Sequence, residues 1–227
     1  LDVMAVQPAQ AAEVAGDSGL SQQLVKVPDL TVYWIVFRVT AALAGNARVR
    51  QAIAQALDRD AFVKQVFAGQ AIGTDTFIPK GMHGYSSTLA AQRFDVAQAR
   101  ATLAASGVTA KQLSGLKFSY DQSNDFDKLT AQFVQEQLKA NLGVDITLQG
   151  LDSNTLSSHL GSGDFQLAGA MGWTADYPDP ADWFDNFVST SSYDVALYQN
   201  QQYDNFVRAA RTDVDPARRD QEYQQAQ

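Results

Sequence analysis

The sequence predicts an α/β fold with a partly parallel sheet flanked by helices, and the observations behind this prediction lie between residues 116 and 173. Three strand patterns in this stretch (LKFSYD, VDITLQ and FQLAGAMGW) alternate with two helical patterns. A β-α-β-α-β order implies neighbouring parallel strands that are joined by right-handed crossovers. Ligands bind beyond the carboxyl ends of such strands, which here fall near Asp121, Gly150 and Trp173.

The first part of the chain alternates strand and helix patterns. The segment LDVMAV is typical of a short strand, and a short helix is expected from Pro8, because proline suits the first turn of a helix. Two β-rich segments follow, QQLVKVPDL and TVYWIVFRV, separated at Pro28. The run from Tyr33 to Phe37 is so apolar that we expect this strand to be buried on both faces.

Helical patterns follow from residue 46. Residues 46–57 place Val49, Ile53 and Leu57 on one stripe, and Asp58 or Asp60 is expected to cap the next helix. This next helix is expected to bury Phe62, Val63, Val66 and Phe67. A long glycine-rich loop comes after it, and a capped helix over residues 95–105 is stopped by Gly107.

The central helices have clear start and stop signals. Asp125 is expected to cap a helix that runs to about Leu142 and ends at Gly143. Its inward side chains are expected to be Phe126, Leu129, Phe133, Val134 and Leu138. Asp152 or Ser153 starts a short helix. At the end of the chain, a solvated helix is expected with Asp215 as its cap and Pro216 in its first turn.

Composition narrows the classes of function. The chain has 227 residues with 45% hydrophobic content, enough for one large or two smaller globular units. Its net charge is -8, which argues against nucleic acid as a partner. The absence of cysteine excludes disulfides, thiolate metal sites and cysteine nucleophiles. The sequence begins with Leu1 rather than Met and closes at Gln227 within a helical pattern, so we expect it to be a fragment.

The most unusual stretch is MGWTADYPDPADWFD, residues 171–185, in which four aspartates alternate with aromatic residues. Asp176 is the first carboxylate beyond the last strand and lies close to Trp173 and Tyr177. A carboxylate beside aromatic faces suits an ammonium group, through charge-assisted hydrogen bonds and cation–π attraction. The alternative is that Asp176 is a turn or cap residue and Trp173 is part of the core.

The other acids of this stretch are expected to have structural roles. Asp179 lies in a turn between two prolines, Asp182 is expected to cap a short helix, and Asp185 is expected to be exposed. Calcium is a poor fit, because the four acids lack the ligand spacing and the glycine of an EF-hand loop. We therefore expect no metal site here.

Catalytic patterns are weak throughout the sequence. His83 and His159 lie far apart and neither belongs to an HExxH motif. The motifs GxSxG, GxxxxGK[ST] and GxGxxG are absent. A pair of carboxylates for glycoside hydrolysis forms in space, and nothing in the sequence selects one. Three arginines are expected to form helix-end ion pairs with Asp58 and Asp60 rather than a basic patch, namely Arg48, Arg50 and Arg59.

Five stretches follow one another in an order that is typical of one protein family. They are ARVRQAIAQALDRDAFVKQVFAGQ, TFIPKGMHGY, FDVAQARATLAASG, MGWTADYPDPADWF and YDNFVRAARTDVDPARRDQEYQQAQ. Through them the sequence resembles the family 5 extracellular solute-binding proteins, the substrate receptors of oligopeptide, dipeptide and nickel ABC importers. The resemblance covers nearly the whole chain from about Leu30.

The resemblance implies a periplasmic-binding-protein-like lobe with a mixed, partly parallel sheet. Residues 1–29 would be a residual first-lobe segment and the crossing, and residues 30–227 the second lobe, truncated before its last return to the first. We expect an extracytoplasmic, monomeric receptor, periplasmic or a cell-surface lipoprotein, that delivers its ligand to the ABC permease subunits. It would be no enzyme and would need no cofactor. Membrane association would depend on an N-terminal anchor outside this sequence.

The resemblance also implies a site for a peptide. In peptide-binding members, the aspartate after the W-x-x motif holds the α-ammonium group, and that position is Asp176 here, with Trp173 and Tyr177 as walls. From the neighbouring strand end, Asp121, Gln122 and Ser123 are expected to line the site. The stretch SYDQSNDFDK lacks the arginine of dipeptide-specific members, so a longer peptide fits better than a dipeptide. Open alternatives are an oligosaccharide or metal chelate as ligand, a hydrolase that uses the loop carboxylates, and a regulatory or adhesion module.

Overall fold

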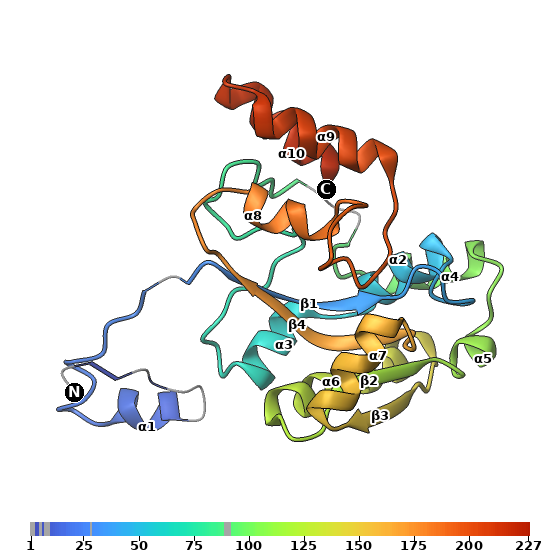
Figure 1. The fold of residues 1–227 in the computed structure, drawn as a ribbon. Helices are drawn as coiled ribbons and strands as arrows, with labels where there is room; N and C mark the ends of the chain where they lie inside the picture. Colours follow the sequence, from blue (N-terminus) through green and yellow to red (C-terminus); the bar gives the residue numbers. More distant parts are fainter. Residues whose placement is uncertain (1–2, 5, 7–9, 28, 89–91) are drawn as a thin grey trace.

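The computed structural model describes residues 3–4, 6, 10–27, 29–88 and 92–227 (Figure 1). The strands are β1 (Thr31–Phe37), β2 (Lys117–Asp121), β3 (Thr147–Leu151) and β4 (Leu167–Thr174). The helices before β3 are α1 (Ala11–Gly16), α2 (Ala47–Gln55), α3 (Arg59–Val66), α4 (Val96–Ala105), α5 (Ala110–Leu113) and α6 (Asp125–Leu142). The later helices are α7 (Ser153–Ser162), α8 (Ala181–Phe184), the 3-10 helix η2 (Asp185–Phe187), α9 (Gln201–Thr212) and α10 (Pro216–Ala226).

The described strands form one mixed sheet in the order β1-β4-β2-β3. β2 pairs in parallel with both β3 and β4, whereas β1 is antiparallel to β4 at the edge of the sheet. This arrangement confirms the predicted α/β class and the parallel β-α-β-α-β unit. Because β2, β3 and β4 run in the same direction, their carboxyl ends lie at one edge of the sheet, where the stretch after β4 begins.

Side chains alternate between the two faces of the sheet, and each face has its own core. On one face, Phe118 and Leu167 pack with Val134 and Leu138 of α6 and with Ile53 of α2, and all of them are buried. This explains the apolar spacing of the α2 and α6 sequences. The opposite face carries a smaller cluster of Val36, Phe165, Ala168 and Ala196.

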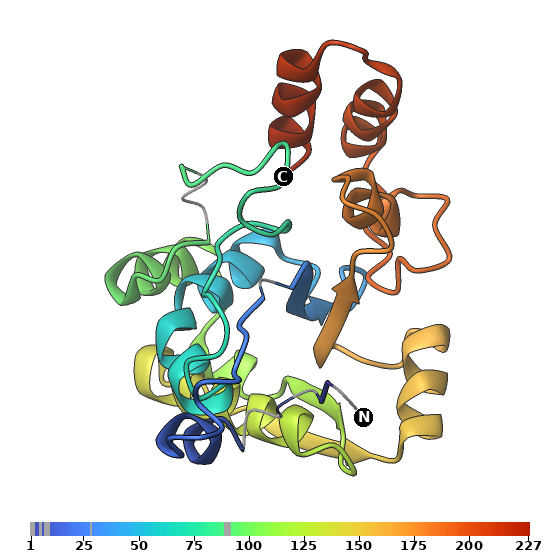
Figure 2. The ribbon, with the colours of Figure 1, turned by 90° about the vertical axis from the view of Figure 1, so that its left-hand side faces the viewer.

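A third cluster joins the C-terminal helices to the start of β1. It contains Trp183 and Phe184 of α8, Tyr203 of α9, Tyr223 of α10 and Val32 of β1. In Figures 1 and 2, α9 and α10 lie next to each other beyond the end of β4, with α8 beneath them. The chain therefore leaves the sheet through β4 and enters a helical subdomain within a few residues.

Most predicted helix boundaries are confirmed by their caps. The side chains that accept a backbone N–H in the first turn are those of Asn46, Asp58, Asp95, Asp152 and Asp215. Gly143 ends α6 with a φ of 69°, in the left-handed region that glycine adopts without strain. The cap of α6 is Asn124 rather than the predicted Asp125, since the Asn124 side chain accepts the Phe126 N–H at 3.0 Å.

Three burial predictions were wrong. Tyr33 is 49% exposed, because β1 lies at the edge of the sheet and other elements cover only part of the Tyr33 side chain. Leu129 of α6 is 47% exposed, because it points away from the sheet side of the helix. The predicted inward residues of α3 are only half-buried, and α3 has no buried residue.

Other local predictions differ in detail. Residues 22–27 and 29–30 form no strand, and much of LDVMAV lies outside the described residues. The arginines do not form the expected ion pairs with Asp58 and Asp60. Arg48 donates to the carbonyl of Ala105 and Arg50 to that of Ala44. Arg59 donates to the carbonyls of Ala54 and Leu57 and lies 3.6 Å from Asp75. The three arginines therefore bind backbone carbonyls instead of Asp58 and Asp60.

Residues 10–27 lie to one side of the body of the molecule in Figure 1, and α1 has no buried residue. The predicted division of the chain at residues 29 and 30 stays a prediction. No helix among the described residues is both long enough and apolar enough to cross a bilayer.

Candidate functional site

A pocket of about 420 Å³ opens at the carboxyl end of β4. Its walls include Trp173, Asp176, Tyr177, Asp182, Asp185 and Tyr193. The stretch after β4, from which the sequence analysis predicted a ligand site, thus lines this pocket, and its role in ligand binding stays a prediction. Tyr193 was missed, because it comes from a distant loop; its ring packs edge-to-face on Trp173 at 5.2 Å between centroids.

Asp176 is exposed at this pocket. Within the described part of the chain, its carboxylate has no hydrogen-bond or ion-pair partner, and its backbone N–H donates to Asp182. Such a carboxylate is free to accept hydrogen bonds from a cation outside the chain. The alternative agrees with the structure in part: Asp176 lies in the bend after β4, although it caps no described helix, and Trp173 is partly buried against the cluster that contains Trp183.

Asp182 has a different place from the predicted one. It lies inside α8 rather than at its cap and is only 7% exposed. Its Oδ2 accepts two hydrogen bonds, from the Trp173 indole Nε1 at 3.1 Å and from the Asp176 backbone N at 2.8 Å. The sequence carried one signal for this role: an acid directly before the apolar pair WF is expected to need a buried partner.

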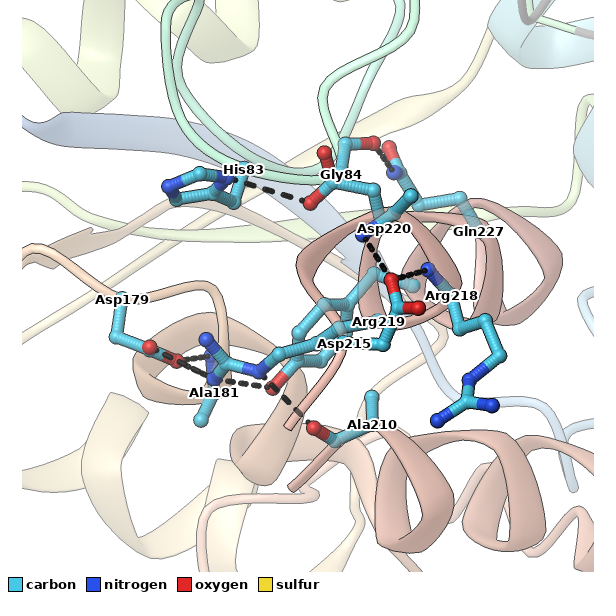
Figure 3. A network of polar contacts seen from close by, with 12 residues as sticks. His83, Gly84, Asp179, Ala181, Ala210, Asp215, Arg218, Arg219, Asp220 and Gln227 are labelled. Carbon is cyan, nitrogen blue, oxygen red and sulfur yellow. Dashed lines mark hydrogen bonds and ion pairs between the residues drawn. The ribbon is translucent and has the colours of Figure 1, made fainter. Parts of the chain in front are cut away.

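Asp179 lies just before α8 and joins the start of this helix to α10. Its Oδ1 accepts the Ala181 N–H at 2.9 Å, and both of its oxygens accept from Nη2 of Arg219 at 2.7 Å. Arg219, on α10, also donates through Nε to the Ala210 carbonyl at 2.9 Å (Figure 3). The stretch that carries Asp176 is thus tied to the two last helices of the chain.

Asp185 is partly buried, contrary to the expectation of an exposed acid. Burial raises the pKa of its carboxyl above the ordinary value, and the Arg211 guanidinium, 3.0 Å from Oδ2, opposes this shift. Tyr177 is 48% exposed, and partial burial followed by the charge of Asp182 raises the pKa of its hydroxyl. Neither group carries a positive charge in any protonation state, so neither repels a cation at this pocket.

The predicted residues on β2 lie outside this pocket. Asp121 accepts hydrogen bonds from the Ser123 hydroxyl at 2.6 Å, from the Ser123 N–H at 2.9 Å and from the Ser153 hydroxyl. These bonds, those from Ser123 first, lower the pKa of its carboxyl. Asp121 is thus held within its own turn.

Strand lengths explain why Asp121, Gln122 and Ser123 do not reach Asp176. Ser119 pairs with Ala168, and β2 ends two residues after Ser119 whereas β4 continues six residues after Ala168. The difference of four residues corresponds to about 13 Å of strand. The two groups share one edge of the sheet but not one pocket, and a ligand would have to be long to touch both.

The two histidines do not form a common site. His83 lies 3.4 Å from Asp220 and His159 lies 3.8 Å from Asp164, each with a single acid. Among residues 3–4, 6, 10–27, 29–88 and 92–227, no group of three or more histidine, aspartate or glutamate side chains is arranged to hold a metal ion.

Comparison with known proteins identifies the family. The family model described as bacterial extracellular solute-binding proteins, family 5 Middle, matches residues 1–194. The chain belongs to this family. This match confirms the predicted family, whose members are binding proteins rather than enzymes, and the description as extracellular agrees with the expected extracytoplasmic location.

Individual relatives agree with this assignment. The chain is 30% identical over 200 residues to the oligopeptide-binding protein OppA of Bacillus subtilis, covering 85% of this chain and 36% of the relative. It is 28% identical over 208 residues to the probable D,D-dipeptide-binding periplasmic protein DdpA of Escherichia coli, covering 90% and 39%. The chain therefore spans less than half the length of these curated relatives.

Solved structures share the fold. The unliganded open form of the periplasmic murein tripeptide-binding protein MppA superimposes with a TM-score of 0.87 at 23% identity, covering 96% of this chain and 43% of that one. Haemophilus influenzae OppA in complex with RPPGFSPFR gives a TM-score of 0.82 at 21% identity, covering 98% and 44%. These likenesses confirm the predicted periplasmic-binding-protein-like lobe.

Proposed function

We propose that this member of the family binds a peptide and that Asp176 pairs with the α-ammonium group of the peptide. The observation that carries the proposal is the free Asp176 carboxylate, which lines a pocket together with Trp173 and Tyr177 at the ligand-binding edge of the sheet. The relatives named for oligopeptide and D,D-dipeptide binding support peptides as the class of ligand.

The chemistry of the pocket favours a cationic group. An ammonium ion that leaves water needs an ionised partner, and the face of an indole ring adds cation–π attraction. Among the described residues, the only ion pair of an acid that lines the pocket is the one between Asp185 and Arg211. Asp176 therefore remains available for a positive charge that comes with the ligand.

The wider role follows from the family. The receptor would act outside the cytoplasmic membrane and deliver its peptide to an ABC permease, with ligand binding driving closure of two lobes. Residues 30–227 would belong to the second lobe and residues 1–29 to the first lobe and the crossing. Asp121, Gln122 and Ser123 would then contact a more distant part of a long peptide. A monomeric state and an N-terminal anchor stay predictions.

The test is a titration of the 227-residue chain with trialanine and N-acetyl-trialanine, followed by NMR because this method tolerates weak binding. Asp176→Asn removes a charge-assisted hydrogen bond of about 1.5–3 kcal/mol, which corresponds to a loss of about 10- to 150-fold in affinity for trialanine. Binding of the acetylated peptide, which lacks the ammonium group, should be equally weak in both proteins.

The matched control is Asp164→Asn, which changes the net charge by the same amount. Asp164 precedes β4, at the opposite edge of the sheet, and its side chain is 82% exposed. This control should bind trialanine like the original protein. If Asp176→Asn leaves the affinity for trialanine unchanged, the ammonium proposal is refuted, and a sugar or metal chelate held by aromatic stacking becomes the better hypothesis.

A further inference from the structure

We infer that Asp182 is the positioning residue of the ammonium site, a role that rests on the function proposed above. One oxygen of this carboxylate, Oδ2, accepts from both components of the site, the indole Nε1 of Trp173 and the backbone N of Asp176. Trp173 lies in β4 and Asp176 in the loop beyond it. Asp182 thus connects the strand and the loop from a third element, α8.

Burial makes these two hydrogen bonds effective constraints. Asp182 is 7% exposed, so water competes little for its oxygen. The bond to Nε1 limits rotation of the Trp173 ring, which also packs edge-to-face with Tyr193 and against the cluster that contains Trp183 and Phe184. The bond to the backbone of Asp176 fixes the point from which the Asp176 side chain starts. The Trp173 ring and the Asp176 backbone are therefore held in place before any ligand arrives.

Asp182 is itself held in place from two sides. The Asn186 side chain, which is 5% exposed, donates to the backbone carbonyl of Asp182 at 3.1 Å. At the start of α8, the Asp179 carboxylate accepts the Ala181 N–H, and Arg219 binds this carboxylate from α10 (Figure 3). A chain of contacts thus leads from α10 through α8 to the indole and the loop of the site.

Asp182 could instead act on the ligand by its charge, and the two roles differ in what Asp182→Asn does. The asparagine carbonyl can occupy the place of Oδ2 and accept both hydrogen bonds, but it carries no negative charge. Asp182→Leu has similar volume and accepts neither bond. A positioning residue tolerates the first change and not the second, whereas a charged ligand group tolerates neither.

The experiment compares the original chain with Asp182→Asn, Asp182→Leu and Asp176→Asn. Two readouts are recorded by NMR: the indole N–H resonances of the three tryptophans, with that of Trp173 identified by Trp173→Phe, and the ratio of affinities for trialanine and N-acetyl-trialanine. We expect Asp182→Asn to keep the Trp173 resonance downfield and the affinity ratio within about 3-fold. Asp182→Leu should move this resonance upfield and lower the ratio by about 10-fold, the effect of losing hydrogen-bonded orientation.

Several outcomes would overturn the inference. If Asp182→Leu does not fold, Asp182→Asn alone decides. If Asp182→Asn lowers the ratio of affinities for trialanine and N-acetyl-trialanine to that of Asp176→Asn and leaves the Trp173 resonance unmoved, Asp182 acts by charge. An unchanged ratio in a folded Asp182→Leu shows that the two bonds do not position the site. If the original chain itself does not prefer the free amine, the proposed function fails, which is distinct from a failure of Asp182 alone.

Discussion

Arg219→Ala should lower the stability of the protein more than loss of Arg218, the exposed arginine next to it on α10. The side chain of Arg219 binds both oxygens of Asp179 at 2.7 Å and the carbonyl of Ala210 at 2.9 Å, and its guanidinium lies 5.4 Å from the centre of the Tyr223 ring. Removal of these contacts separates the loop of the site from the last two helices.

The magnitude follows from the partial burial of the pair. The side chains of Arg219 and Asp179 are 24% and 27% exposed, between a surface pair worth about 0–1 kcal/mol and a buried pair whose disruption costs about 3–5 kcal/mol. Loss of the arginine should therefore cost about 2 kcal/mol. For a chain of this size that corresponds to a decrease of about 4–8 °C in Tm.

The assay is thermal and urea unfolding followed by circular dichroism, with Arg218→Ala as the matched control. Arg218 is the neighbouring residue on α10, and its side chain is 64% exposed. It binds Asp213, the residue directly after α9, at 2.9 and 3.0 Å. The control should lower stability clearly less than Arg219→Ala does, because an ion pair of an exposed arginine contributes little. Equal losses of stability in the two variants would refute the idea that Arg219 joins the loop to the helices.

Two further predictions concern stability. Gly84→Ala should lower the free energy of unfolding by about 2–5 kcal/mol, because φ is +74° and a Cβ would lie 2.7 Å from Cβ of Tyr223. The control Gly69→Ala, with φ +76° and open space around it, should cost about 1–2 kcal/mol. Equal costs in denaturant unfolding would contradict the packing argument. Burial raises the pKa of the Asp194 carboxyl, and its Oδ1 has no hydrogen-bond partner among the described residues. At pH values above this raised pKa, the ionised carboxylate therefore destabilises the fold. Asp194→Asn should therefore stabilise the protein by about 1 kcal/mol at pH 7, and this gain should shrink as the pH falls towards 3.8; a gain that grows in acid would show the opposite sign of coupling.

The fold could be predicted from the sequence where local signals agree with tertiary packing. The helix that became α6 has its polar start, its apolar stripe and Gly143 at its end within one stretch, so its bounds were nearly correct. The parallel unit followed from chain order and the right-handed crossover rule. Exposure was harder, because whether Tyr33 or Leu129 is covered depends on which element lies opposite, and periodicity carries no such information.

The candidate site divides along the same line. Trp173, Asp176 and Tyr177 are close in sequence and follow one strand, so their proximity in the pocket could be predicted. The positions of Asp121 to Ser123 depended on how far β4 extends beyond β2, which is a matter of register and strand length. A shared edge of the sheet is thus a weaker statement than a shared pocket.

The roles of the four acids after β4 show what sequence spacing leaves out. They recur every three residues, yet their partners differ within the part of the chain that the structure describes. The Asp176 carboxylate has none there, Asp179 accepts the first N–H of α8 and binds Arg219, Asp182 accepts the N–H of an indole, and Asp185 binds an arginine of α9. Each role is decided by a donor that the loop meets only after folding, and two of these donors belong to α9 and α10. An acid that finds no such donor keeps its charge for a ligand, so the absence of an internal partner, rather than the pattern of acids, singles out Asp176.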